Sequence, residues 1–467
     1  MYKSKLASFA AALLMCGASA PALAQAEGQP VSMRDAIAVA MDSNPEILQA
    51  QMNTEAIQAE RKQAQGLYAP RVTLDASAGA RRLENATRRN LGIADDWLYP
   101  LEASASAEWV ALDFGRRRGE LLRQASRVDG ASLRVLERSQ YVALQIARQY
   151  LDILLQQRVL AASQDNTAFH RSLVGDLQEG VRQGSISIAD QQQAEERLQA
   201  ALVREEEATE ALKDAKITLR TLTGLDVDGV VLPPQLAASL PPTETEAISL
   251  VRTENPKVKE AIADVDAANA LAKSAAGDLY PEIGVDVRGR VGEDIDGFKG
   301  NANDIQGRVF LRWDIFDGGI NRAKLQEMVR RASEARYRLH QVQRQAEEDV
   351  RTAWTAMESR ANIVRALERQ SQVTDDLLLS YRSQFNVGRR SLLDVLDAQN
   401  TRYNTQVRLE TARFSQLFAE YQTLASTNKF IDALGVSPGE GAGMQERERF
   451  NYGPPAPAEL QRRVYPK

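Results

Sequence analysis

The chain has 467 residues, a net charge of −5, 26% charged residues and only 6% aromatic residues. This length allows two to four ordinary domains or one elongated domain, and the low aromatic content argues against one large core. Because no basic excess is present, the composition gives no support for a nucleic-acid partner.

The first 24 residues are predicted to be a secretory signal peptide. Two lysines precede the apolar run 6–15, and Ala22-Leu23-Ala24 forms a small-residue cleavage motif. The only cysteine, Cys16, lies inside this segment, and the alternative in which it becomes a lipidated first residue is disfavoured by the preceding Met15. After the signal no apolar run reaches about 18 residues, so any membrane crossing would have to use β-strands.

The rest of the chain contains one pattern twice. Each copy begins with an Asn-Pro pair, Asn44-Pro45 or Asn255-Pro256, in which Asn is a preferred helix N-cap and Pro a preferred first helical residue. Two segments of period-two hydrophobicity follow, and each pair ends in the motif Trp-x3-Asp-x-Gly. We therefore predict two strands per copy, within 70–114 and 281–317, joined by long polar loops.

The predicted strands carry apolar side chains on one face and side chains of both charges on the other. Val309, Leu311 and Trp313, for example, alternate with Arg308 and Arg312. This pattern is typical of a barrel with lipid outside and water inside, although an amphipathic sheet with one solvated face is the more common alternative. Four strands cannot close a barrel of this kind, and an open edge is not tolerated in lipid, so three identical chains would share twelve strands.

Each strand pair is followed by a very long helical segment, 119–180 or 321–386, that would reach on the order of 90 Å. Positions seven apart are apolar at every place but the fourth, which holds Thr167 in the first copy and Ser371 in the second. Such a repeat predicts coiled-coil hairpins, with tips near residues 184 and 388.

The sequence carries no motif of an enzyme. It has no nucleophile elbow or zinc motif, and the glycines at 439, 441 and 443 lack the flanking strand and helix of a phosphate site. His170 and His340 lie inside the long helices without a metal partner at ligand spacing, so both are expected to be solvated. We expect neither an enzymatic activity nor a metal or cofactor.

The predicted architecture is mainly α with a small transmembrane β part, built from two tandem repeats. The first repeat spans 25–224 and the second 244–436, and a Pro-rich connector covers 225–243. The Gly- and Pro-rich tail, 437–467, is expected to be disordered.

The hairpin tips carry the residues by which the chain resembles a known family. The segment from Phe385 to Gln399, FNVGRRSLLDVLDAQ, is echoed by GSISIAD from Gly184 to Asp190. Together with the Asn-Pro starts and the Trp motifs, these segments make nearly all of the mature chain similar to the TolC family of outer-membrane channel proteins. The resemblance implies a homotrimer in the outer membrane of a Gram-negative bacterium, with a 12-stranded β-barrel continued by a 12-helix coiled-coil tunnel through the periplasm.

The resemblance also implies a gate at the tips. Asp394 and Asp397 lie at i and i+3 on one helix face and would form acidic rings that favour cations, whereas the ordinary alternative is a solvated surface pair. Arg390 and Asp190 would belong to a polar latch between neighbouring hairpins. Phe385 stands where the family has a latch Tyr, which removes a hydroxyl and a possible hydrogen bond.

Four further residues, Gly184, Ser185, Val387 and Gly388, are expected to form tip grooves that a periplasmic adaptor (membrane fusion) protein grips. In such an assembly the channel is a passive conduit, opened by the adaptor and by an inner-membrane ABC or RND transporter. The run 409–424 and the lack of lipidation favour type I protein secretion, with multidrug or metal efflux as the first alternative.

Two other classes of protein are weaker alternatives. A periplasmic adaptor would have one hairpin flanked by β-rich domains, and a soluble coiled-coil scaffold would need no Trp-ended apolar strands.

Overall fold

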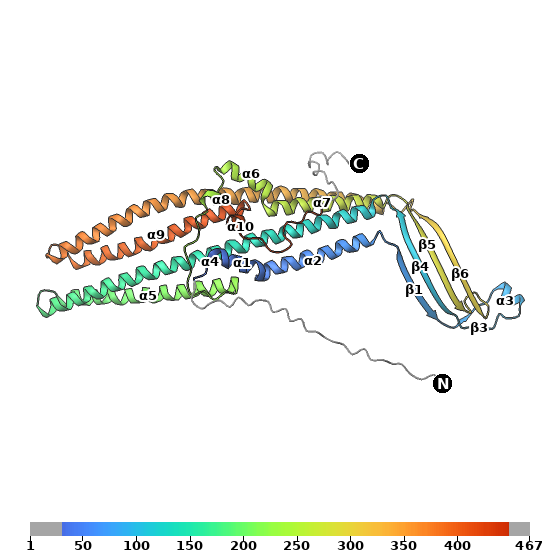
Figure 1. Ribbon diagram of the computed structural model, residues 1–467, viewed down its shortest axis with the longest axis horizontal. Helices are drawn as coiled ribbons and strands as arrows, with labels where there is room; N and C mark the ends of the chain where they lie inside the picture. The colour runs from blue at the N-terminus through green and yellow to red at the C-terminus, as the bar shows by residue number, and fades with distance from the viewer. Residues whose placement is uncertain (1–29, 448–467) are drawn as a thin grey trace, which may run out of the picture.

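The computed structural model describes residues 30–447 as an elongated molecule, with a four-stranded sheet at one end and two helical hairpins at the other (Figure 1). The predicted signal peptide and the tail beyond residue 447 lie outside the described residues.

The two halves of the chain share the order of two helices, two long strands, a long helix and a returning helix, which confirms the predicted tandem repeat; β2, α3 and β3 are additional in the first half and α10 in the second. The first half contains α1 (Met33–Ser43), α2 (Pro45–Gly66), β1 (Arg71–Ala78), β2 (Arg81–Arg82), α3 (Ala86–Asn90), β3 (Trp97–Leu98), β4 (Leu101–Leu112), α4 (Arg116–Arg182) and α5 (Ile188–Thr223). The second half contains α6 (Glu244–Glu254), α7 (Pro256–Gly277), β5 (Glu282–Glu293), β6 (Asn301–Arg312), α8 (Ile320–Asn386), α9 (Leu392–Ser426) and α10 (Phe430–Ala433).

The Asn-Pro pairs begin helices, as predicted, and they also tie those helices to their own repeat. The Asn44 side chain accepts the Glu46 N–H at 2.9 Å and donates to the Leu222 carbonyl, at the end of α5, at 3.0 Å. Asn255 does the same in the second half and donates to the Ser426 carbonyl, at the end of α9, at 3.0 Å. One residue type therefore caps a helix and anchors the returning arm of each hairpin.

The long helices set the length of the molecule. Helices α4 and α8 have 67 residues each, which corresponds to about 100 Å. Helix α5 packs on α4 and α9 packs on α8, and the two hairpins meet along a seam between α4 and α9 (Figure 1). Within residues 30–447, no helix combines the length and the apolar composition that a membrane-spanning helix requires.

The sheet is antiparallel in the order β1-β4-β5-β6, so β1 and β6 form its two edges. One face exposes large apolar side chains, among them Leu74 and Ile305, which are 80% and 86% exposed. The other face carries ion pairs between strands, such as Arg308 to Asp286 at 2.7 Å and Arg288 to Glu102 at 3.4 Å. The alternation predicted from the sequence is therefore present in the strands.

The first part of the tail is ordered against the helices, contrary to the expectation of disorder from residue 437. Residues 437–447 lie along α4, where Ser139 Oγ accepts the Gly439 N–H at 3.0 Å and Ser132 Oγ accepts the Met444 N–H at 3.1 Å. The buried carboxylate of Asp129 accepts the N–H groups of Glu446 and Arg447 at 2.6 and 3.0 Å. The composition of the tail concealed this docking because backbone groups make most of the contacts.

Candidate functional site

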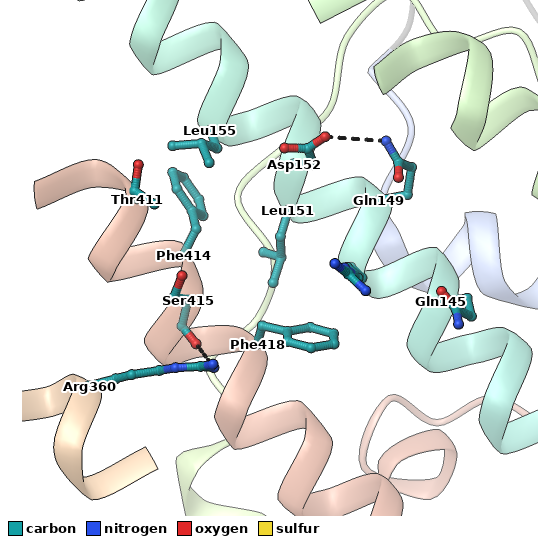
Figure 2. Close-up of a pocket in the computed structure, with 11 residues that line it drawn as sticks. Gln145, Gln149, Leu151, Asp152, Leu155, Arg360, Thr411, Phe414, Ser415 and Phe418 are labelled. Atoms are coloured by element: carbon teal, nitrogen blue, oxygen red, sulfur yellow. Dashed lines mark hydrogen bonds between the residues drawn. The ribbon is translucent and has the colours of Figure 1, made fainter. Parts of the chain in front are cut away.

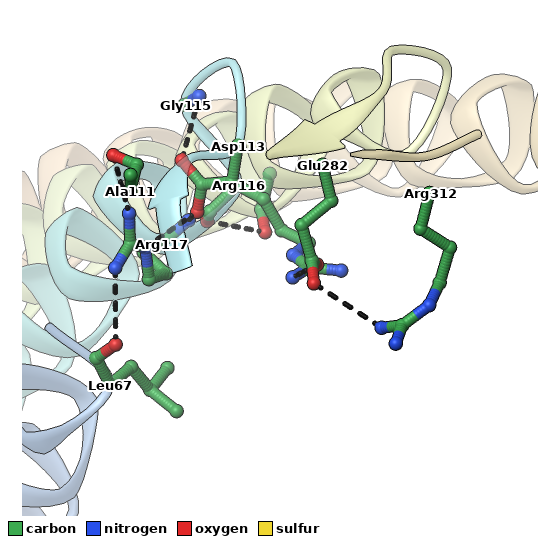
Figure 3. A network of polar contacts seen from close by, with 9 residues as sticks. Leu67, Ala111, Asp113, Gly115, Arg116, Arg117, Glu282 and Arg312 are labelled. Atoms are coloured by element: carbon green, nitrogen blue, oxygen red, sulfur yellow. Dashed lines mark hydrogen bonds and ion pairs between the residues drawn. The ribbon is translucent and has the colours of Figure 1, made fainter. Parts of the chain in front are cut away.

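The motif Trp-x3-Asp-x-Gly forms the junction between the sheet and the tunnel helix (Figure 3). Asp113 follows β4 and accepts the N–H of Gly115 at 3.3 Å, the N–H of Arg117 at 2.8 Å and the Arg117 Nε–H at 2.9 Å. Gly115 has φ +96°, a left-handed conformation that glycine adopts without strain. The Asp therefore caps the first turn of α4, and the Gly allows the chain to bend into it.

The second repeat uses the same junction with one difference. Asp317 accepts the N–H groups of Gly319 and Asn321 at 2.9 and 2.8 Å, where the first repeat has Arg117 in place of Asn321. The buried Arg117 additionally donates to the carbonyls of Leu67 and Ala111 at 3.3 and 3.4 Å (Figure 3). Arg117 thus ties the first junction to the end of α2 and to β4, whereas in the second junction Trp313 Nε1 donates to the Leu279 carbonyl, just after α7, at 3.2 Å.

Hydrogen bonding keeps both junction carboxylates ionised. Burial raises the pKa of Asp113, but the hydrogen bonds from Arg117 outweigh it and leave that pKa below its ordinary value. The pKa of Asp317 is lowered mainly by the hydrogen bond from the Asn321 N–H. Both caps therefore stay charged in the neutral pH range.

The hairpin tips are short turns that need glycine for their backbone conformation. Gly184 and Gly388 have φ of +72° and +73°, and a Cβ added to either would meet nothing within 4 Å. Ser185 and Val387, beside them, are exposed. Of the four residues expected to form adaptor grooves, Gly184 and Ser185 thus lie at the free end of the α4–α5 hairpin, and Val387 and Gly388 at the free end of the α8–α9 hairpin (Figure 1).

Two of the predicted gate carboxylates bond the serine that caps their own helix. Asp190 accepts the Ser187 hydroxyl at 2.8 Å at the start of α5, and Asp394 accepts the Ser391 hydroxyl at 2.8 Å at the start of α9. Asp394 completes a capping box, because its side chain also accepts the Ser391 N–H at 3.4 Å. The paired Ser-x-x-Asp signals at the tips are therefore explained locally.

Asp397 has no such local role. It is exposed on α9, and its carboxylate has no hydrogen-bond or ion-pair partner among residues 30–447. Arg390 lies between the two arms of its own hairpin. Its guanidinium carbon lies 4.1 Å from the centroid of the Tyr381 ring, and its Nε–H donates to Gln384 Oε1 at 3.2 Å. It also lies 3.7 Å from the Asp394 carboxylate.

Phe385 joins the two hairpins by packing. It is half-buried and contacts two apolar clusters, one containing Leu177 and Leu396 and the other containing Leu378 and Val395. The ring therefore supplies apolar contact at the position where the resemblance implied a hydroxyl.

Sequence reasoning missed a group of buried polar residues on the α4–α9 seam, which we name the polar layer. Its members are Ser163, Asn166, Thr167, His170, Gln399 and Tyr403. Asn166 Oδ1 accepts the Gln399 Nε2–H at 2.9 Å, and the hydroxyls of Ser163 and Tyr403 lie 2.9 Å apart. The only sequence signal was Thr167, the hydroxyl that interrupts the apolar heptad positions.

The expectation that both histidines are solvated is correct for His340 and wrong for His170. His340 is exposed, whereas His170 is only 5% exposed and its ring stands edge-on to Phe169. Burial, with the nearby charges of Arg197 and Arg204, lowers the pKa of His170 to about 4. His170 is therefore a neutral, buried residue of the seam.

On the sheet side of the polar layer the seam opens into a groove (Figure 2). Phe414 and Phe418 of α9 lie there beside Leu151 and Leu155 of α4, and the Arg360 side chain of α8 crosses to donate to the Ser415 carbonyl at 2.8 Å. The hairpins are therefore not in continuous apolar contact along their length.

The comparisons with known proteins agree with this architecture. The family described as outer membrane efflux protein matches residues 36–225 and 247–428, which correspond to the two repeats. The protein BepC of Brucella suis, an outer membrane efflux protein, is 26% identical over 62% of this chain, and the match spans only 63% of BepC. The outer membrane protein TolC of Vibrio cholerae is 23% identical over 82% of this chain and 87% of its own length. The alkaline protease secretion protein AprF of Pseudomonas aeruginosa is 23% identical over 61% of each chain.

Solved structures share the fold. A membrane protein from Pseudomonas aeruginosa superposes with a TM-score of 0.75 at 19% identity, over 85% of this chain and 93% of that one. The open-state MtrE outer membrane channel of Neisseria gonorrhoeae gives a TM-score of 0.68 at 20% identity, over 88% and 91% of the two chains. Since the family match covers both repeats, the chain belongs to the outer membrane efflux protein family of TolC-like channels.

Proposed function

We propose that three copies of this chain form the exit duct of a tripartite machine for type I protein secretion. One observation is the main support for a channel. The sheet is apolar on one face and ion-paired on the other, and it lies about 100 Å from the glycine turns of the hairpins. Such a molecule has one end suited to a lipid boundary around water and another suited to periplasmic partners. The chain itself performs no chemistry in this proposal.

Protein secretion is favoured over small-molecule efflux by two features. The relative AprF is named for alkaline protease secretion, and Met15 disfavours lipidation at Cys16. The run 409–424 contributes less than the sequence suggested, because Tyr421 and Leu424 are fully buried and have a packing role. Multidrug or metal efflux is the second candidate, which the name of BepC favours.

The gate in this proposal lies at the hairpin tips. Asp397 would supply the principal carboxylate ring of the trimer, since its side chain is exposed and has no partner among the described residues. Asp394 would add a second ring while it caps α9. Arg390 and Asp190 would reach the neighbouring copy as latch residues, with Phe385 packing behind them, and the adaptor would bind the turns at Gly184, Ser185, Val387 and Gly388.

Deletion of the gene, with and without complementation, tests the export role. We expect the deletion strain to lose a large exported protein from the culture supernatant, with an ABC transporter as the inner-membrane partner, and the wild-type gene to restore it. Unchanged supernatant proteins together with raised sensitivity to drugs or metals would replace secretion by efflux and favour an RND partner. A deletion that changes neither would contradict the duct.

A further inference from the structure

The sheet leaves both of its edges open. The outer sides of β1 and β6 have no partner strand among residues 30–447. Main-chain N–H and C=O groups along such an edge lack partners, so a sheet at a lipid boundary has to pair its edges. In the three-copy assembly proposed above, β6 of one copy would pair with β1 of the next.

The tandem repeat supplies a template for that junction, because the two strand pairs share one register. Arg71 of β1 lies opposite Glu108 of β4. Glu282 of β5 lies opposite Arg312 of β6 at the same place in the second pair. Strand β1 therefore corresponds to β5, with residue 71 matching 282, and β4 corresponds to β6, with residue 108 matching 312. Since β4 pairs with β5 inside the chain, β6 would pair in the same way with β1 of the next copy.

Transferring the internal register to the edges predicts which polar residues meet. Inside the chain, Glu108 of β4 lies opposite Asp286 of β5. Their counterparts at the edges are Arg312 of β6 and Asp75 of β1. The internal junction therefore places two acids opposite each other, whereas the junction between copies would place an arginine opposite an aspartate.

Both side chains are available for this contact in the single chain. Asp75 is exposed, and its carboxylate has no hydrogen-bond or ion-pair partner among residues 30–447. The Arg312 side chain is 67% exposed, and its ion pair with Glu282 is long, at 3.4 Å. Glu282 already has a closer cation in Arg116. Each copy thus carries an unpaired acid on one edge and an exposed cation on the other.

The apolar face agrees with the same register. Leu311 and Val309 of β6 are 63% and 75% exposed in the single chain. By the transferred register Leu311 would lie opposite Ala76 of the next copy, and Val309 opposite Ala78. Large side chains of one edge would therefore meet small side chains of the other, which allows close packing across the junction.

Other registers fit less well. A shift by one residue would turn the apolar face of β6 toward the polar face of the neighbouring strand. A shift by two residues would place either Asp314 or the Phe310 ring opposite Asp75. The first arrangement brings like charges together, and the second leaves the carboxylate beside an apolar ring.

We propose that β6 of one copy pairs with β1 of the next in the register of the β4–β5 junction, and that Arg312 and Asp75 form the ion pair by which one copy recognises the next. The proposal rests on the three-copy assembly of the proposed function and adds the residues that specify its junction. Because the corresponding internal pair is two acids, the ion pair also distinguishes the junction between copies from the junction inside a copy.

Paired cysteines test the register. Leu311 and Ala76 lie on opposite edges of one sheet, so a disulfide in the variant Leu311→Cys/Ala76→Cys joins two copies. The natural Cys16 lies in the predicted signal peptide. After oxidation of outer membranes that contain the full-length variant, we expect covalent dimers and trimers on a denaturing gel without reductant. The control Leu311→Cys/Ala78→Cys should give about fivefold less product, because diagonal neighbours are about 7–8 Å apart, beyond the usual reach of a disulfide.

The outcomes separate the register from the assembly. More product from the control pair than from the matched pair would overturn the register and leave the three-copy assembly standing. Absence of product from both pairs would also overturn the register, and a chain that is then monomeric on a native gel would remove the three-copy assembly with it. Because no cargo is involved, the result does not depend on the export role.

Charge reversal tests the ion pair. Asp75→Arg would place two arginines opposite each other and Arg312→Asp two acids, so each should lower the yield of assembled trimer by about threefold or more. The double variant Asp75→Arg/Arg312→Asp restores opposite charges and should recover wild-type yield, which a general folding defect would not allow. The ion pair is overturned if the single variants assemble like the wild type, or if the double variant assembles no better than they do.

Discussion

At the scale of single residues, His170 links burial to pH. Its pKa is lowered to about 4 from the ordinary 6.5, so the folded chain disfavours the protonated ring and the unfolded chain does not. Between these two values the unfolded state binds more protons, and stability must therefore fall as the pH falls. Above pH 6.5 the ring is neutral in both states and makes no pH-dependent contribution.

We predict that the free energy of unfolding falls as the pH is lowered from 6.5 to 4, because of His170, by on the order of 3 kcal/mol per chain. His170→Thr, which introduces the residue type found at the equivalent buried position Thr374, should lower this pH dependence. Thermal unfolding of detergent-solubilised trimers at several pH values measures it. The exposed His340 provides the control. If His340→Thr reduces the pH dependence of stability as much as His170→Thr does, that dependence does not come from His170.

At the scale of elements, the ordered part of the tail acts as a strap across the two repeats. Arg447 donates to Asp129 of α4 at 2.7 Å and to Asp266 of α7 at 2.6 Å. Burial raises the pKa of Asp266, and the nearby charge of Arg447 opposes that rise. One guanidinium therefore neutralises two buried carboxylates from different halves of the chain.

Replacing Arg447 by alanine should destabilise the trimer by about 3 kcal/mol, because it leaves two buried acids without their shared cation. Arg413→Ala is a matched control, since Arg413 also bridges two acids, Glu368 and Glu410, but at the surface, where such pairs contribute little. Denaturant unfolding of the two variants gives the comparison. Equal losses would show that the strap is not a stabilising contact.

The same elements show how much the sequence could predict. Local signals predicted the Asn-Pro helix starts and the period-two strands, because each depends on neighbouring residues. The strap and the buried state of His170 could not be predicted in this way. The Gly- and Pro-rich composition of the tail is typical of disorder, and the contact that orders it comes from Asp129, which is distant in sequence. A lone His in a polar stretch is typical of a solvated helix face, and His170 is buried only because the other hairpin packs over it.

At the scale of the whole molecule, the repeats are equivalent in backbone and different in charge. Asp190 and Asp394 both accept the hydroxyl of the serine that caps the returning helix of their hairpin, so each has a local partner in its own repeat. Asp397, in contrast, corresponds to Gln193 in the first repeat. Only the second hairpin therefore presents a free carboxylate at this place, and a trimer would gather three of them at its periplasmic end.

We predict that Asp397→Gln, which copies the first repeat, lowers the cation preference of the reconstituted channel by a factor of about two or more, since it removes one exposed charge per chain from a ring. Trimer stability should not change, because the carboxylate has no partner among the described residues. The reversal potential in a KCl gradient measures the preference. Asp214→Asn, which removes an exposed carboxylate of α5 far from the tip, should leave it unaltered. If both variants shift the reversal potential equally, the preference comes from the total charge of the tunnel, and Asp397 does not line the constriction.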